Sequence, residues 1–185
     1  MGIYNYYHNN CNCNLQVGSL KKEVTIAIII LIIFLFIATL DPFEPTDLVN
    51  EKTISNYSNL FFDYKIIRYP TSAEIVPVTE ENINLGIVTD PWNIKFGIIP
   101  GNGSYVKRYI NIKNMNENFS KITLKTYGNI TPLVNFSKND FDLSGNESVA
   151  VEANLYTESA EFGNYSGEID VIIKTPKYDL LKIIT

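Results

Sequence analysis

An uncharged apolar run near the N-terminus constrains this chain more than any other feature. The residues from Val24 to Leu40 include no charged side chain. At about 1.5 Å of rise per residue, a helix over this run reaches roughly 25 Å, slightly less than the roughly 30 Å hydrocarbon layer of a bilayer. Local thinning of the bilayer and snorkelling of Lys21 and Lys22 can absorb the difference. The run therefore predicts a transmembrane helix over residues 23–40.

The alternatives to a retained anchor are a buried core helix and a cleaved export signal. A core helix would show a polar stripe at helical period, but the only hydroxyls of the run, Thr25 and Thr39, lie near its ends. A cleavable signal has a shorter apolar core with small residues before the cut, whereas Leu40 stands at that place in FIATLDP. We expect a signal anchor, and whether it is cleaved stays open.

Charge predicts the orientation of this anchor. Lys21 and Lys22 precede the run, whereas Asp41, Glu44 and Asp47 follow it. Because basic residues favour the cytoplasmic side, we expect a single-pass protein of the cell membrane with residues 1–22 as a short cytoplasmic tail. The C-terminal portion is then extracytoplasmic. The net charge of −5 and the scattered basic residues argue against a nucleic-acid partner, which needs clustered cations.

Both cysteines of the chain lie in the N-terminal tail. Cys11 and Cys13, with His8, are three soft ligands close together in sequence. A structural zinc site needs four ligands, so we expect two reduced thiols, with a soft-metal site as the alternative. The extracytoplasmic portion has no cysteine and must rely on a hydrophobic core without disulfides. We expect no cofactor.

Acceptor sequences for N-glycosylation occur only after the apolar run, where Asn-x-Ser/Thr is about threefold more frequent than composition predicts. This distribution favours an extracytoplasmic location and predicts glycans at some of the sites. The candidate asparagines are Asn56, Asn102, Asn118, Asn129, Asn135, Asn146 and Asn164.

The first part of the extracytoplasmic portion is interrupted by prolines. Residues 41–81 contain Pro42, Pro45, Pro70 and Pro77. We interpret them as a juxtamembrane stalk or irregular lead-in, in which NLFFDYKIIRYP and AEIVPV are candidate short strands. Whether this segment joins the following domain stays open. The domain itself is predicted over residues 82–185.

From residue 82 onward the apolar residues recur with a period of two. Turn sequences separate the runs: PGNGS at 100–104 is a hairpin signal, and SGNES and FGNYSG are similar. Six to eight short antiparallel strands and no helix predict an all-β fold, an immunoglobulin-like β-sandwich. In SYVKRYINIKN one residue, Arg108, falls on the apolar face, where it could snorkel at an edge. The predicted strands lie in SYVKRYINIKN, SKITLKTYG, SVAVEANLY, SGEIDVIIKTP and YDLLKIIT.

The series IKFGIIPGNGSYVKRYINIKN, FDLSGNESVAVEANL and GNYSGEIDVII resembles the membrane-anchored or secreted immunoglobulin-like domains of archaeal surface proteins. A similar cadence occurs in major-sperm-protein-like modules. The resemblance is one of pattern over about residues 82–176, and it implies a surface location and an adhesive, scaffold or assembly role without catalytic residues. The chain lacks the cysteine pair of antibody domains, and Trp92 precedes the strands.

The sequence offers little for catalysis. After residue 40 there is no His or Cys, which excludes Ser-His-Asp and Cys-His systems in this portion and most zinc sites. Acidic residues fall mainly at outward strand positions and in turns, so we expect no enzyme. In DFDLSGNESVAVE, Asp140 and Asp142 begin a near-match to a calcium loop, but Glu152 misses the twelfth position by one. The alternative is a loop that places Phe141 and Leu143 in the core.

These observations favour a non-enzymatic, single-pass, membrane-anchored cell-surface protein whose glycosylatable β-sandwich is a structural or protein–protein interaction module. We expect envelope or surface proteins as partners. One alternative is a subunit of a pilus- or archaellum-like membrane machine, although KKEV lacks the small residue of pilin-type signals. A second is a surface module that binds a ligand or polysaccharide. An aromatic contact face could come from Tyr57, Tyr105, Tyr109, Tyr127, Tyr156 and Tyr165.

Overall fold

The computed structural model describes residues 14–39, 47–78 and 92–178, with the side chains of residues 22–34 within the helix. The chain divides into two compact units, Met1–Glu44 and Pro45–Thr185. The first contains one helix, α1 (Asn14–Thr39). Its apolar side chains from Val24 to Phe34 are exposed on every side of the helix, each by about half its surface. Within the described residues, no helix combines the length and the hydropathy that a membrane crossing requires.

The second unit is built from strands and one short 3-10 helix, η1 (Thr131–Leu133). The described residues form nine strands, two of which are much longer than expected. The strands are β1 (Thr53–Ser58), β2 (Phe62–Val76), β3 (Ile94–Pro100), β4 (Tyr105–Lys113), β5 (Ser120–Gly128), β6 (Val134–Phe136), β7 (Phe141–Leu143), β8 (Ser148–Tyr156) and β9 (Gly163–Pro176).

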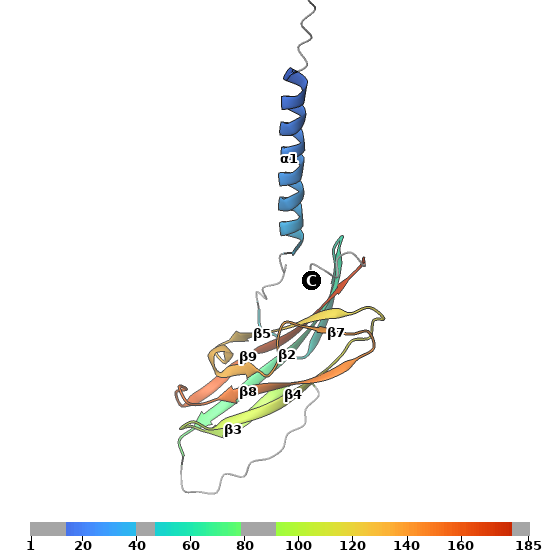
Figure 1. Ribbon diagram of the computed structural model, residues 1–185. Coiled ribbons are helices and arrows are strands. Elements are labelled where there is room, and N and C mark those ends of the chain that lie inside the picture. Colours follow the sequence, from blue (N-terminus) through green and yellow to red (C-terminus); the bar gives the residue numbers. More distant parts are fainter. Residues whose placement is uncertain (1–13, 40–46, 79–91, 179–185) are drawn as a thin grey trace, which may run out of the picture. The chain divides into compact units, whose positions relative to one another are not determined.

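These strands form two sheets (Figure 1). The larger sheet has the order β1-β2-β9-β5-β7, and β3 pairs in parallel with the second half of β2. The smaller sheet has the order β4-β8-β6. The six to eight strands predicted from residue 82 onward agree with the seven that the structure describes there, β3 to β9. The expectation that all strands are antiparallel was wrong, because β2 and β3 are parallel, and β1 and β2 join the sheet from the preceding segment.

The inner faces of the two sheets share one hydrophobic core. The smaller sheet contributes alternate residues of β8, Val151, Ala153 and Leu155, each fully buried. The larger sheet contributes Ile122 of β5 and Ile169 of β9, which are equally inaccessible. Alternation with a period of two puts these side chains on one face of each strand, as the sequence predicts. The prediction of a mostly β, two-layered fold is confirmed.

Whether residues 41–81 join the following domain was left open, and the described part of this segment does join the larger sheet. Strand β2 is central to the larger sheet, pairs with β9 from Phe62 to Ile75, and contributes Ala73 and Ile75 to the core. The prolines misled the prediction. Pro70 lies within β2, between Arg68, the last residue paired with β1, and Thr71, the first paired with β3. A residue without a backbone N–H fits a gap in the ladder on one side.

Two segments predicted as turns also differ from the prediction in the structure. PGNGS does not form a hairpin, because β3 pairs with β2 and β4 belongs to the other sheet. The connection nevertheless has the positive φ that its sequence favours, at Asn102 and Gly103. FGNYSG was expected as a turn, but from Gly163 it belongs to β9, because β2 is long enough to pair with it down to Ile75.

Arg108, the charged residue on the apolar face of β4, lies at the seam between the two sheets. Its Nε donates a hydrogen bond to the Lys95 carbonyl at 2.7 Å, and one Nη donates to the Phe96 carbonyl at 3.3 Å. Both carbonyls belong to β3, so the guanidinium satisfies backbone acceptors of the neighbouring sheet.

Some predictions concern residues outside the described ranges. They include His8, Cys11, Cys13, Asp41, Glu44, the boundary at residue 82, and the last predicted strand beyond Tyr178.

Candidate functional site

The outer face of the smaller sheet carries three exposed tyrosines, which we call the tyrosine face. Tyr105 and Tyr156 are direct partners across β4 and β8, and their nearly parallel rings lie 6.1 Å apart between centroids. Tyr109 follows on the same face of β4, because side chains four positions apart on a strand point the same way. The exposed fractions are 59% for Tyr105, 47% for Tyr156 and 63% for Tyr109.

Polar side chains lie between these rings. The register places Lys107 opposite Asn154 and Tyr109 opposite Glu152. Lys107 Nζ donates to Glu152 Oε2 at 3.0 Å, and this hydrogen bond is the main cause of a raised pKa of Lys107. Tyr109 Oη donates to the other Glu152 oxygen at 3.4 Å. The charges of Lys107 and Glu152 at the centre of the tyrosine face therefore neutralise each other.

Asn154 is the unusual member of this group. Its side chain is on the outer face, yet the residue is only 8% exposed. Its Oδ1 accepts no hydrogen bond from any residue that the structure describes. A buried amide oxygen without a donor costs free energy, about 1–3 kcal/mol, so it calls for an explanation.

Half of the tyrosines expected to form an aromatic face do not join it. Tyr57 lies in the larger sheet with its ring 5.9 Å from that of Tyr64. Tyr127 lies on β5, and Tyr165 on β9 donates its hydroxyl hydrogen to the Glu161 carbonyl at 2.9 Å. Sequence spacing could not separate them from Tyr105, Tyr109 and Tyr156, because which strands become neighbours depends on the fold.

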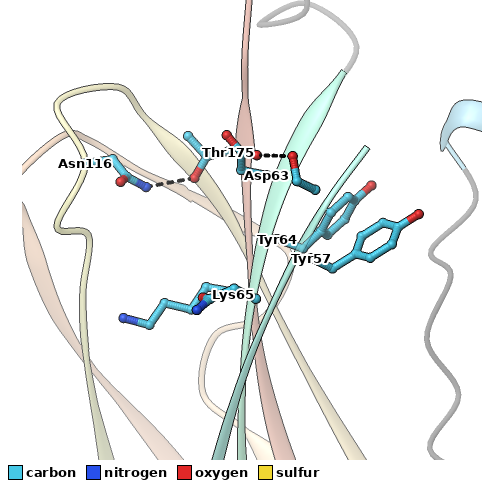
Figure 2. A pocket seen from close by; sticks show the side chains of 8 residues that line it. Tyr57, Asp63, Tyr64, Lys65, Asn116 and Thr175 are labelled. Carbon is cyan, nitrogen blue, oxygen red and sulfur yellow. Dashed lines mark hydrogen bonds between the residues drawn. The ribbon is translucent and has the colours of Figure 1, made fainter. Parts of the chain in front are cut away.

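An open groove of about 300 Å³ lies at one end of the larger sheet. In Figure 2 the rings of Tyr57 and Tyr64 lie together on one side of the strands, with Asn116 and Thr175 on the other. The polar groups of the groove bond one another: Asn116 Nδ2 donates to Thr175 Oγ1 at 3.0 Å, and Ser58 Oγ donates to Asp63 Oδ1 at 2.7 Å. These pairs leave the groove poorly prepared for a ligand. Its lining residues are Asn56, Tyr57, Ser58, Asp63, Tyr64, Lys65, Asn116 and Thr175.

A buried charged cluster lies on the outer face of the larger sheet. Glu168 of β9 is fully buried, and its carboxylate accepts hydrogen bonds from Arg68 of β2 at 2.8 Å and from the Val49 backbone N–H at 2.8 Å. Arg68 also donates to the Asp47 carbonyl. The cluster thus holds the segment that precedes β1 against the sheet.

Asp170 is the second carboxylate of this cluster, with Oδ1 3.8 Å from Arg68 Nε. Burial raises the pKa of Asp170 to about 7, and repulsion from Glu168 adds to the rise, while Arg68 opposes it. Because the Glu168 carboxylate is fully engaged in hydrogen bonds, we interpret Glu168 and Asp170 as carboxylates that stabilise the fold. Perturbed carboxyl groups occur in structural ion-pair networks as well as in active sites.

The expectation that acidic residues lie mainly at outward positions missed this cluster. Glu168 and Asp170 do lie on the face turned away from the smaller sheet, but that face is covered here. One feature of the sequence indicates that this face is covered. The unbroken run Val171, Ile172 and Ile173 is typical of a strand buried on both faces, and all three are nearly inaccessible.

The near-match to a calcium loop is divided by strand structure. Phe141 and Leu143, at the two ends of β7, are buried, as the alternative reading expected. Asp140 accepts a hydrogen bond from Thr123 at 2.8 Å, and Asp142 is exposed. Across the described ranges, no three His, Cys, Asp or Glu side chains gather where they could hold a metal ion.

Every asparagine of the seven acceptor sequences is exposed. The other described asparagines are mixed: Asn114 and Asn154 are buried and Asn59 and Asn93 are half-buried, whereas Asn50, Asn111, Asn116 and Asn139 are exposed. Asn102 and Asn146 stand in turns with positive φ, and Asn135 stands on β6 opposite Asn154. Each site is thus sterically open to modification.

No protein-family model matches this chain, and no curated protein matches it either.

Proposed function

We propose that this chain is a non-enzymatic, single-pass, membrane-anchored cell-surface protein. Its β unit acts as an immunoglobulin-like interaction module that contacts envelope components through the tyrosine face. The observation that carries the proposal is the gathering of Tyr105, Tyr109 and Tyr156, all exposed, on one sheet face. Tyrosine is enriched where proteins bind partners, because its ring supplies contact area and its hydroxyl a hydrogen bond.

Support for the anchor comes from the apolar run, which extends from Val24 past Phe34, where the described side chains of α1 end, to Leu40. Within the described part, apolar side chains are exposed all round the helix. A helix that is apolar on every side needs an apolar environment, either a bilayer or a protein core. The basic residues Lys21 and Lys22 favour a cytoplasmic N-terminus.

Support for an extracytoplasmic β unit comes from the acceptor asparagines. They are exposed without exception, whereas of the eight other asparagines with described side chains two are buried and two are half-buried. A chain that had to leave these positions open for glycans would show this distribution. The sandwich architecture and the pattern-level resemblance to archaeal surface domains agree with such a location but carry no activity by themselves.

Protease shaving of intact cells, followed by mass spectrometry of the released and retained peptides, tests this proposal. Peptides from residues 47–178 should be released, some with glycans on acceptor asparagines, while peptides from residues 1–22 stay protected. A matched variant, Lys21→Glu with Lys22→Glu, should reduce or invert the asymmetry because it removes the positive-inside signal. Protection of the β unit in wild-type cells, with release only after lysis, would overturn the proposed location.

A further inference from the structure

We infer that the tyrosine face binds an uncharged polysaccharide chain, laid along β4 and β8 with sugar rings packed on Tyr105 and Tyr156. This inference rests on the proposed function, in which the tyrosine face is the contact surface, and it specifies the chemical class of the partner.

The dimensions of the face favour a narrow ligand. The nine residues of β4 extend over about 26 Å, and the three strands of the sheet cover only about 10 Å between their outer axes. The face therefore offers an area on the order of 300 Å², whereas a standard protein interface buries about 800 Å² on each partner. A single sugar chain matches a surface that is long and narrow.

The chemistry of the face favours sugars as well. Pyranose rings present C–H faces that pack on aromatic rings, and hydroxyls that donate and accept hydrogen bonds at the rim. Tyr105 and Tyr156 form one aromatic position, and Tyr109 forms a second about 13 Å further along β4. Two aromatic positions at this separation suit a polymer better than a single sugar.

Asn154 supplies an independent observation. It lies between the two aromatic positions, opposite Lys107 on one side and Asn135 on the other. Its Oδ1 is an acceptor without a donor among the described residues, and the residue is more than nine-tenths buried. A sugar hydroxyl bound over this position would supply the missing donor, after a small displacement of the side chains above it.

The charged residues of the tyrosine face indicate that the polysaccharide ligand is uncharged. Lys107, the cation nearest the centre, is already paired with Glu152 at 3.0 Å. Recruiting it to an acidic sugar would leave Glu152 close to the ligand's own negative charge. An anionic polysaccharide would therefore gain little from this face.

Isothermal titration of the full chain in detergent micelles with chitohexaose and cellohexaose, and with hexagalacturonate as the anionic contrast, tests the inference. At least one uncharged hexasaccharide should bind and hexagalacturonate should not. Tyr156→Ala and Tyr105→Ala should each weaken binding about tenfold or more, whereas Tyr105→Phe, which keeps the ring, should bind within about twofold of wild type. Tyr57→Ala, on the other sheet, is the matched control and should leave affinity unchanged.

Asn154→Ala separates a binding role from a structural one. Because its Oδ1 has no described donor, this variant should not lower the thermal midpoint below that of wild type but should lose affinity for the hexasaccharide. If neither uncharged hexasaccharide binds, or if the tyrosine variants bind as wild type does, the inference is wrong. Capture of an envelope protein on cells that depends on Tyr105 and Tyr156, without glycan binding, would overturn the inference and leave the proposed function standing.

Discussion

Arg68 of β2 and Glu168 of β9 form an ion pair, with 2.8 Å between Nη2 and Oε1 and no exposed surface on the Glu168 side chain. The pair is buried on the outer face of the larger sheet, where Glu168 also accepts the Val49 backbone N–H. It joins the segment before β1 to the centre of the sheet. The energetic consequences of that burial can be measured directly.

Glu168→Gln should destabilise the β unit by about 3 kcal/mol, because the substitution removes the carboxylate that pairs with Arg68 at 2.8 Å in a mostly buried site and leaves only Asp170, at 3.8 Å. Chemical denaturation of the full chain in detergent measures this loss. Glu152→Gln is the matched control. It breaks the exposed Lys107–Glu152 pair, which should cost less than about 1 kcal/mol. Equal losses for the two variants would contradict the burial-based argument.

The raised pKa of Asp170 predicts how the stability of the β unit depends on pH. The sign is opposite to that expected for an ordinary salt-bridged carboxylate. Its pKa rises from 3.8 to about 7 on folding, mainly through burial, so between these values the folded state binds more protons than the unfolded state. Stability contributed by this group is therefore present at low pH and lost as pH rises through about 7. Asp170→Asn should remove this loss. The variant should therefore gain stability relative to wild type as pH rises.

Denaturation midpoints of wild type and Asp170→Asn at several pH values check this sign. The group faces Glu168 on its own strand, Arg68 on β2 and Lys125 on β5, and all three remain in the variant. Asp142→Asn, at an exposed position of β7, should follow wild type at every pH. A wild-type curve that rises from pH 4 to 7 relative to Asp170→Asn would show that the pKa of Asp170 is not raised.

Asn114 is a buried residue whose side chain joins several loops by hydrogen bonds. Asn114→Ala should lower the free energy of unfolding by about 3 kcal/mol, because it leaves the acceptors unpaired. Its Nδ2 donates to the carbonyls of Asn118 at 2.8 Å, Leu143 at 3.0 Å and Ser144 at 3.1 Å. Its Oδ1 accepts the Asn116 backbone N–H at 3.0 Å. The control Asn111→Ala removes an exposed asparagine of β4 and should stay within about 0.5 kcal/mol of wild type. A loss of stability under 1 kcal/mol for Asn114→Ala would show that the hydrogen bonds of Asn114 do not contribute as expected.

Strands β4, β5 and β8 could be predicted from sequence because their apolar residues alternate. Val149, Val151, Ala153 and Leu155 mark β8 unambiguously, and the structure has β8 from Ser148 to Tyr156. Strand β2 was harder. Its alternation is interrupted by Pro70, and only the pairing of one edge with both β1 and β3 explains why a proline is tolerated there. Such a gap is a property of the sheet and is invisible in the strand's own sequence.

The candidate site was partly predictable for a similar reason. Alternation puts Tyr105 and Tyr109 on the outward face of β4, but only the pairing of β4 with β8 places Tyr156 against Tyr105. Asn154 had no sequence signal, because its burial and its unpaired oxygen depend on neighbours from two other strands. Residues on one strand can be grouped from sequence, whereas a face made by three strands needs the topology.

Gly145 allows the loop between β4 and β5 to approach the turn between β7 and β8. A Cβ at this position would clash with the backbone carbonyl of Glu117, and the adjacent Asn146 N–H donates to the Asn116 carbonyl at 3.1 Å. Gly145→Ala should therefore destabilise the unit by about 2 kcal/mol, since backbone atoms must move.

Asn146→Gly is the matched control for this prediction. Asn146 has φ of 62°, so glycine relieves its left-handed conformation while adding freedom to the unfolded chain, and the two effects nearly cancel. Thermal unfolding of unglycosylated protein compares the two variants without the glycan that Asn146→Gly would also remove. If Gly145→Ala unfolds at the wild-type temperature, the two loops have room to separate and their contact does not contribute to stability.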